Sequence, residues 1–523
     1  MKTIKDINLG FSDAINYGQR KNKALFDSIF VKNHFLEDIL SPSKYFLIGE
    51  KGTGKTAYAT YLSNHEYKDT VSYLKFIQTT DYEKFHTLKK EHHLEISDYT
   101  EIWKTIILML LCKSMTDKND LIKPIGNNGI SNINKAIDDY YKNAFTPEIL
   151  YALRMIDKNE LAAKFVSKYF DSGMSASTSS EIESTEMRWQ MNLFYIAKKF
   201  TDAISKVKLN KNVYLFIDGI DVRPSNFEYG QYIECIKGLE NACWLLNTSV
   251  FSNVRDSRYQ FKVILLLRPD IFHALNLQNS TNKLRDNSIY LNWNTTYKEY
   301  KTSPLYEIGN KLLGYEQNYQ GDIWEQYFDW KIPSGNKTRP FDTAFMAFLK
   351  ISLSRPRDIS VILSELQSLM KANRMGNAKK FEYEIFKSNA FQNAYSEYFM
   401  SSLQDQLSFY CSPEHFKFFK RFFDYFDDSE FTYDTYKQNY NKFVDYLLMN
   451  VKDIPAIYND EREFLQLLYN CNLITAVVDD GEFFHFSYRE KSLSNINPQI
   501  LIDTNVKYRF HYGIFKKTAL GRF

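Results

Sequence analysis

The octapeptide Gly49-Glu-Lys-Gly-Thr-Gly-Lys-Thr56 fits the pattern G-x-x-x-x-G-K-[S/T], which is typical of a phosphate-binding loop. The apolar run 45–48 before it predicts a short buried strand, and the apolar residues after it keep a helical period. In such a setting the backbone N–H groups turn toward phosphates, and the helix N-terminus adds partial positive charge. We expect Lys55 to contact the phosphates and Thr56 to ligate Mg²⁺. An ordinary glycine turn is the alternative, and the flanking patterns disfavour it.

Composition narrows the class of protein. The chain has 523 residues, a length that indicates several domains. Its net charge is +3 and 25% of its residues are charged, so the overall charge indicates no attraction to nucleic acid or membranes. Five cysteines without a C-x-x-C pair favour a reducing compartment and no zinc site. The longest wholly apolar run, 106–112, is too short to span a bilayer, and the first residues lack a signal-peptide core. We therefore expect a cytoplasmic protein without membrane association.

Apolar runs predict five strands, at residues 45–48, 72–77, 213–217, 263–267 and 288–292. The third and fourth runs are almost continuously apolar, as expected for central parallel strands that are buried on both faces. Because parallel strands need crossover helices, the sequence predicts an α/β fold with the parallel αβα sheet of a P-loop NTPase.

Residues 1–300 are expected to form this core. Within it, residues 78–205 predict a helical insertion with a subdomain of its own. Its two apolar stripes are Ile102, Trp103, Ile106, Ile107, Leu110 and Leu111, and Trp189, Leu193, Ile196, Phe200 and Ile204.

Two further regions follow the core. Residues 301–400 predict a helical lid, with a clear helix behind Pro356. Residues 401–523 predict a winged-helix-like domain. Its signals are an aromatic helix from Pro413, a helix around Phe464, a turn at 479–481 and an alternating run from 484 to 488.

Asp218 ends the third predicted strand, where an acid beside a phosphate-binding loop can hold Mg²⁺ together with Thr56. A buried strand followed by an Asp-Gly turn is the alternative. Gly219 comes next, at the position where many related ATPases carry a catalytic glutamate. The following acid is Asp221, which we expect to polarise the attacking water, with a plain loop acid as the alternative. Hydrolysis is therefore expected to be slow or partner-stimulated.

Several arginines are candidates for phosphate contacts. Arg268 ends the fourth strand at a sensor position, with an ion pair to Asp270 as the alternative. Arg357 opens the lid helix and is the second sensor candidate, with Arg355 as its rival. A finger arginine that enters a neighbouring copy is a third role, for which the candidates are Arg285, Arg255 and Arg258, each with surface exposure as the alternative.

The predicted site residues form two sets. The catalytic set is Lys55, Asp218, Asp221 and Arg268. The nucleotide-binding set is Gly49, Glu50, Lys51, Gly52, Thr53, Gly54, Lys55, Thr56, Ala57 and Arg357.

The final segment 506–523 carries five basic residues and no acid, and aromatic residues are interleaved among them. Such a segment can bind nucleic acid, and a solvated terminal strand is an equally good interpretation.

The ordered motifs GEKGTGKT, LFIDGID, ILLLRPDIF, SIYLNW and SRPRDI resemble the STAND and ORC-like branch of AAA-type P-loop ATPases, of the bacterial defence-associated kind. The resemblance covers roughly residues 1–400. It implies a switch that uses ATP and Mg²⁺, forms homo-oligomers, and engages DNA or a companion effector protein, often against phage. The glycine after Asp218 departs from motor-type members and argues against fast processive work. The alternative function is a non-hydrolysing nucleotide-binding scaffold that recruits a partner effector.

Overall fold

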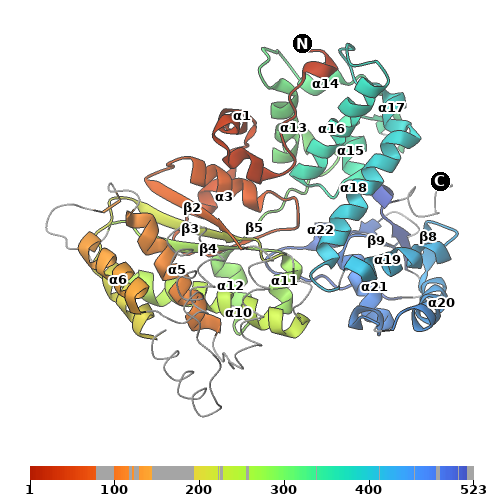
Figure 1. Cartoon of the computed structure of the whole chain (residues 1–523). Coiled ribbons are helices and arrows are strands. Elements are labelled where there is room, and N and C mark those ends of the chain that lie inside the picture. Colours follow the sequence, from red (N-terminus) through yellow and green to blue (C-terminus); the bar gives the residue numbers. More distant parts are fainter. Residues whose placement is uncertain are drawn as a thin grey trace, which may run out of the picture.

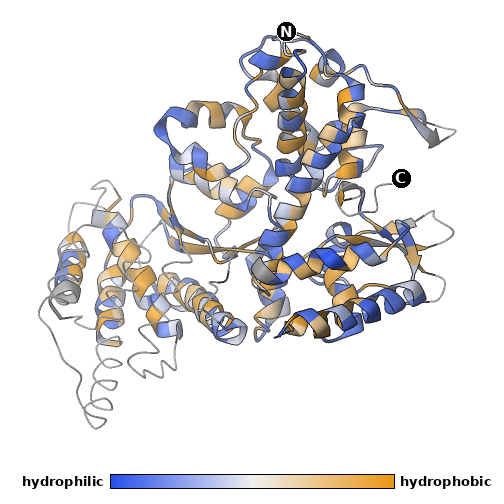
Figure 2. Ribbon diagram, turned by 45° about the vertical axis from the view of Figure 1, so that its right-hand side comes forward, coloured by the Kyte–Doolittle hydropathy of each residue, from blue (hydrophilic) through white to orange (hydrophobic). Residues whose placement is uncertain are grey.

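A computed structural model describes residues 1–77, 99–116, 121–122, 129–143, 194–221, 223, 228–254, 258–336, 339–411, 413–452, 454–478, 483–503 and 506–514. Within these ranges, a central sheet with helices on both faces adjoins a helical region and a C-terminal α/β unit (Figure 1). Figure 2 shows hydrophobic and hydrophilic residues on the same helices, as expected where a helix covers a core with one side. No helix of the described ranges is both long and apolar enough to cross a membrane.

The central sheet is parallel and has the strand order β2-β3-β4-β1-β5. Its strands are β1 (Phe46–Ile48), β2 (Thr70–Phe76), β3 (Asn212–Asp218), β4 (Phe261–Leu267) and β5 (Ser288–Tyr290). All five predicted strands are confirmed, with ends shifted by a few residues. Because the strands are parallel, the loop after β1 and Asp218 at the end of β3 lie at the same edge of the sheet.

Alternate side chains of the strands enter two different cores, as the two-residue period of a strand requires. Leu47, Tyr214 and Phe216 pack on one face of the sheet. That face is covered by α1 (Lys23–Ile29), α2 (His34–Leu40) and α3 (Lys55–Asn64). Phe46 and Leu215 pack on the other face. Its helices are α5 (Tyr99–Thr116), α10 (Tyr229–Leu245), α11 (Pro269–Ala274) and α12 (Ser280–Asn287).

The described part of the predicted insertion shares the core of the sheet instead of forming a separate one. The six residues of its first apolar stripe are buried in α5, and the Trp103 indole donates a 3.2 Å hydrogen bond to the Cys235 carbonyl of α10. Helix α6 (Gly129–Asn143) contacts α5. Ile196, Phe200 and Ile204 join the same cluster, while Trp189 and Leu193 lie outside the described residues. A helix that is apolar nearly all round, such as α5, is buried on several sides.

The region 301–400 is mainly helical. It contains α13 (Pro304–Gly314), α14 (Ile323–Tyr327), α15 (Ala344–Ile351), α16 (Pro356–Ala372), α17 (Tyr383–Lys387) and α18 (Asn389–Leu407), with an antiparallel pair β6 (Ile332–Asn336) and β7 (Arg339–Asp342). The predicted helix behind Pro356 is confirmed as α16, which places Pro356 at its first position.

The C-terminal unit combines helices with a four-stranded sheet of order β10-β9-β11-β8. Its elements are α19 (Pro413–Phe422), β8 (Glu430–Thr432), α20 (Tyr433–Asn450), α21 (Glu461–Asn470), β9 (Ile474–Val478), β10 (Phe483–His485), α22 (Ser487–Glu490) and β11 (Lys507–Phe510). Strands β9 and β10 pair antiparallel on either side of the predicted turn. Tyr488 lies in α22, so the alternating run ends earlier than predicted. The turn 479–481 is outside the described residues.

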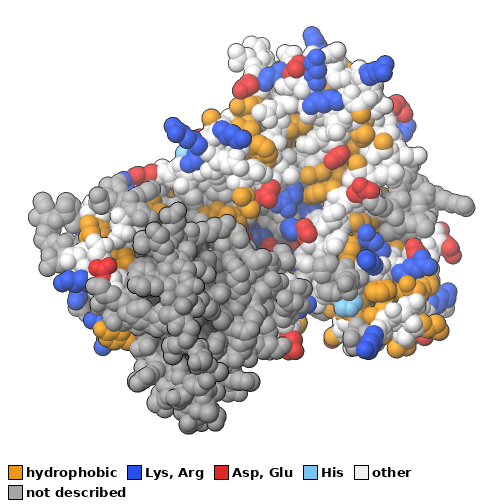
Figure 3. Space-filling model, viewed as in Figure 1, with side chains coloured by type: hydrophobic (Ala, Val, Ile, Leu, Met, Phe, Trp, Pro, Cys, Tyr) orange, Lys and Arg blue, Asp and Glu red, His pale blue; other side chains and the backbone are white. Residues whose placement is uncertain are grey.

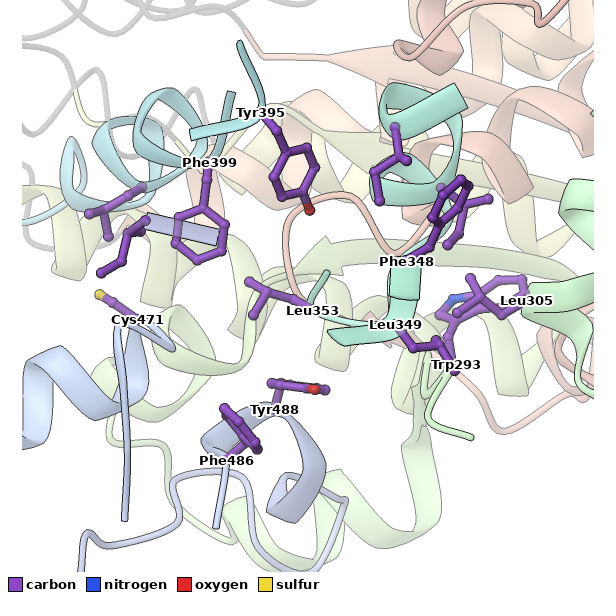
Figure 4. Packing of buried hydrophobic residues seen from close by; sticks show 14 of the residues in the cluster. Trp293, Leu305, Phe348, Leu349, Leu353, Tyr395, Phe399, Cys471, Phe486 and Tyr488 are labelled. Carbon is purple, nitrogen blue, oxygen red and sulfur yellow. The ribbon is translucent and has the colours of Figure 1, made fainter. Parts of the chain in front are cut away.

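Where it is described, the terminal segment is a paired strand of the C-terminal sheet and not a solvated one, and its binding of nucleic acid stays a prediction. Strand β11 lies between β9 and β8, and Tyr508 and Phe510 are buried in the core. Aromatic side chains of this unit and of the helical region belong to one buried cluster, and Figure 4 shows Phe486 and Tyr488 facing Leu353. Residues 515–523 lie outside the described ranges.

Candidate nucleotide-binding site

The loop after β1 turns through two glycines with left-handed backbones, Gly52 with φ +89° and Gly54 with φ +93°. Side chains strongly disfavour these values, so the glycines are needed for the turn. Gly54 is the N-cap of α3, and the loop therefore leads directly into the positive end of that helix. A Cβ atom at Gly52 would lie 3.2 Å from the Cβ of Arg357, so the start of α16 packs closely on the loop.

Lys55 is buried at the first position of α3 and folds back over the loop. Its Nζ donates hydrogen bonds to the carbonyls of Gly49 (2.7 Å) and Glu50 (3.3 Å). Burial lowers the pKa of this ammonium, and the carboxylates of Asp221 and Asp218 act in the opposite direction. An anion at this end of the loop would favour its charged form.

Thr56 and Asp218 meet as the motifs predict. The Thr56 hydroxyl donates a 2.6 Å hydrogen bond to Oδ2 of Asp218, whose Oδ1 accepts one of 2.8 Å from the N–H of Gly219. Burial raises the pKa of Asp218, and the nearby Asp221 raises it further. A hydroxyl and a carboxylate are oxygen ligands of the kind that Mg²⁺ prefers.

The backbone explains why glycine follows Asp218. Gly219 has φ +93°, and a Cβ atom there would lie 2.3 Å from the carbonyl oxygen of Ile77. A glutamate at this position would have to displace the end of β2. Asp221 instead lines the cavity described below. Its Oδ1 is buried and accepts no hydrogen bond from the described residues, which leaves a lone pair for a water or phosphate-bound group.

A cavity of about 330 Å³ lies beside the loop. Two groups of lining residues come from different parts of the fold. The first, called the polar end, is Lys51, Gly52, Gly54, Lys55, Thr56, Asp218, Gly219, Asp221 and Arg357. The second, called the apolar end, is Phe11, Ile15, Tyr17, Phe26, Ile29, Phe30, Val31, Ile308 and Leu312, and the polar residues Ser12 and Asp13 of the N-terminal segment line the cavity as well. The apolar end comes from the N-terminal segment with η2 (Ala14–Gly18), from α1 and from α13. No sequence motif predicts the apolar end, because its short segments are brought together only by tertiary packing.

Trp293 connects the segment after β5 to the loop. Its indole N–H donates a 2.8 Å hydrogen bond to the Thr53 carbonyl, and the Thr53 hydroxyl donates one of the same length to the Glu50 carbonyl. Trp293 also lines the cavity. The loop conformation is therefore held from the side of β5 as well as by its own glycines.

Arg268 does not line the cavity. Its guanidinium is fully buried. It makes two hydrogen bonds to Asp270, of 3.0 and 2.5 Å, one of 3.0 Å to the Gln406 carbonyl, and one of 3.4 Å to the backbone carbonyl of Asp221, which lines the cavity. Burial by itself would raise the pKa of Asp270, but the guanidinium outweighs it and lowers this pKa to about 2. Arg268 therefore forms the ion pair with Asp270 that is the alternative to a sensor role.

The two arginines at the start of α16 have different places. Arg357 lines the cavity, and its Nε donates a 3.2 Å hydrogen bond to the Ser12 carbonyl. Arg355 pairs with Asp358 behind the loop and donates a 2.8 Å hydrogen bond to the Lys51 carbonyl.

Two of the three finger candidates are described, and neither lines the cavity. Arg285 on α12 and Arg258 are both exposed. Arg255 is outside the described residues.

No protein-family model matches this chain, and no curated protein sequence matches it.

Proposed function

We propose that the protein binds Mg-ATP between the loop 49–56 and the helical region 301–400, and that it hydrolyses ATP slowly as a molecular switch. The observation that carries the proposal is the contact between Thr56 and Asp218, which lie 162 positions apart in the sequence. The sequence pattern of a phosphate-binding loop also occurs by chance in unrelated glycine turns. The hydrogen bond between the loop hydroxyl of Thr56 and the acid Asp218 requires both motifs to be correctly placed in space, which neither motif implies by itself.

Electrostatics supports the same ligand. Burial disfavours the charged forms of both Lys55 and Asp218. Phosphates beside Lys55 and a divalent cation beside Asp218 would favour both charged forms. When bound, Mg²⁺ would neutralise charge on the phosphates during transfer of the γ-phosphoryl group to water.

Each part of the cavity then has a role. The N–H groups around Gly52 and Gly54 and the Lys55 ammonium hold phosphates, and Thr56 and Asp218 hold the cation. The apolar end is suited to a nucleobase. Arg357 would bind phosphate from the lid side, because its side chain lines the cavity from the start of α16.

Asp221 is the group best suited to orient the attacking water. It lines the cavity and has a buried oxygen without a hydrogen-bond donor among the described residues. Its side chain is shorter than the glutamate that the backbone of Gly219 excludes. Slow hydrolysis is the expected consequence.

The resemblance to STAND and ORC-like ATPases extends the proposal to homo-oligomerisation and to engagement of DNA or an effector protein in bacterial anti-phage defence. A winged-helix-like C-terminal unit is supported by the helices α19 to α21 followed by the β9–β10 hairpin. The distribution of surface charge supports DNA binding less strongly than the order of these elements does. On the face drawn in Figure 3, Lys and Arg side chains are dispersed among acidic and apolar ones.

The substitution Lys55→Ala tests ATP binding. Titration with ATP and Mg²⁺ should detect binding to the unsubstituted protein and none to Lys55→Ala. The matched control is Lys442→Ala, which removes an exposed lysine on α20 and should bind normally. Equal binding by Lys55→Ala and the unsubstituted protein would overturn the proposal.

The scaffold alternative is favoured by the ion pair of Arg268 with Asp270, because that guanidinium does not line the cavity. A single-turnover assay with and without DNA separates the two functions. Slow cleavage that Asp221→Asn reduces at least tenfold, with ATP affinity retained, supports the switch. Binding without any turnover supports the scaffold.

A further inference from the structure

Two residues of the phosphate-binding loop form ion pairs with residues far along the chain. Glu50 Oε1 lies 2.5 Å from Nζ of Lys491, 441 positions away. Lys51 Nζ lies 2.6 Å from Oδ2 of Asp405 at the end of α18, 354 positions away. These two loop positions are variable in the motif, so phosphate binding does not explain their contacts.

The Glu50–Lys491 pair is the buried one. Its side chains are 8% and 2% exposed respectively, whereas Asp405 in the other pair is 57% exposed. Lys491 directly follows α22, and its Nζ also donates a 3.2 Å hydrogen bond to the Asn470 carbonyl at the end of α21. The ammonium is thus held by the C-terminal unit and directed at the loop.

The position of Glu50 makes this pairing important for an anionic ligand. Glu50 belongs to the loop that would surround phosphates. Its side chain does not line the cavity, but its charge acts on Lys55, which does. An unpaired buried carboxylate there would repel a polyphosphate, and charges interact strongly in a poorly hydrated site. Pairing with an ammonium removes this repulsion and holds the side chain in one position.

We propose that Lys491 is a positioning residue of the nucleotide site: it neutralises and orients Glu50 so that the loop can accept phosphates, and thereby makes the C-terminal unit part of that site. This inference rests on the proposed function. Since linkage between two equilibria is reciprocal, bound nucleotide would in turn strengthen the docking of the C-terminal unit.

The test compares the affinities of ATP, ADP and AMP for the unsubstituted protein and for Lys491→Met. We expect ATP binding to weaken at least tenfold, ADP binding less, and AMP binding least, because the repulsion grows with ligand charge. In the double variant Glu50→Gln/Lys491→Met, which has no unpaired charge, ATP affinity should return to within threefold of the original. The single variant Glu50→Gln removes the carboxylate itself, so ATP binding should not weaken more than AMP binding, and this variant remains informative if Lys491→Met does not fold.

The matched control is Lys380→Met, which breaks an exposed 3.0 Å pair with Asp329 and should leave all three affinities unchanged. Equal ATP affinity of Lys491→Met and the unsubstituted protein would overturn the inference while leaving the proposed function intact. So would an equal loss for ATP and AMP in Lys491→Met, a loss that adding Glu50→Gln does not reverse, or a weakening in Glu50→Gln alone that is larger for ATP than for AMP. An unsubstituted protein that binds no ATP would overturn the proposed function itself and the inference with it.

Discussion

The hydroxyl of Thr56 at the start of α3 donates a 2.6 Å hydrogen bond to the carboxylate of Asp218 at the end of β3. The two strands β1 and β3 are separated in the sheet by β4, so this contact depends on the parallel arrangement of three strands. It brings the two oxygen ligands expected for Mg²⁺ together at one edge of the sheet.

Loss of the Asp218 carboxylate should remove the effect of Mg²⁺ on nucleotide binding. For the unsubstituted protein, we expect ATP to bind at least tenfold more tightly with Mg²⁺ than with EDTA. For Asp218→Asn this ratio should fall close to one, because an amide is a weaker cation ligand than a carboxylate. Isothermal titration in both conditions measures it. The exposed Asp202→Asn serves as control, and a Mg²⁺ effect that persists in Asp218→Asn would contradict the assignment.

Gly219→Ala should destabilise the fold by about 3 kcal/mol, because a left-handed backbone and a close contact both penalise the new methyl group. The added Cβ would meet the Ile77 carbonyl at 2.3 Å. Urea unfolding measures the difference. Gly230→Ala is the matched control, since a Cβ atom near the start of α10 meets nothing within 4 Å. A stable Gly219→Glu protein with faster hydrolysis would show that the backbone does not exclude the glutamate.

Arg268→Met should act through stability. It leaves the buried Asp270 carboxylate without its guanidinium partner, which costs about 3–5 kcal/mol. The double variant Arg268→Met/Asp270→Leu should recover most of this loss, as judged by denaturant unfolding. If Arg268 instead senses the γ-phosphate, the single variant would unfold like the unsubstituted protein and hydrolyse ATP more slowly.

His511 should make the protein less stable in mild acid. Burial lowers the pKa of this imidazole from 6.5 to about 3, with Asp358 acting in the opposite direction and Arg355 reinforcing it. Between these two values the unfolded chain binds a proton that the folded chain does not, so stability is present above pH 6.5 and is lost as the pH falls toward 3. From pH 7 to pH 5 this residue should account for about 2 kcal/mol. In His511→Gln the same pH change should cost that much less, and an identical pH dependence in both proteins would rule out this role.

Elements that depend on neighbouring residues could be predicted from the sequence, whereas contacts between distant segments could not. The runs around Leu47 and Leu215 are strands because a short, almost wholly apolar segment can be buried in a parallel sheet, which is a local property. Strands β8 and β11 have three and four residues, and their pairing joins distant segments, so no local period indicates them. The basic residues of the terminal segment predict a contact with nucleic acid or a solvated strand. The segment also contains the buried side chains of Val506, Tyr508, Phe510, His511 and Ile514.

The different places of Arg355 and Arg357 could likewise not be predicted from the sequence. Arg355 and Arg357 are two positions apart at the start of α16, and one lies behind the loop while the other lines the cavity. Their directions are set by the packing of α16 on Gly52 and by the nearby Asp358. A sequence motif specifies neither how α16 packs on Gly52 nor which acid each arginine contacts.

The order of residues along the chain was sufficient for the loop 49–56, for the strand that ends at Asp218 and for the α/β class, because glycine dihedrals, apolar runs and helix starts are properties of neighbouring residues. Packing in three dimensions was needed to direct Arg268 to Asp270 and to form the apolar end of the cavity. It also brought Lys491 to Glu50 across 441 positions. Such contacts depend on how whole elements pack, and burial gives a charged side chain a strong preference for whichever opposite charge the fold brings near.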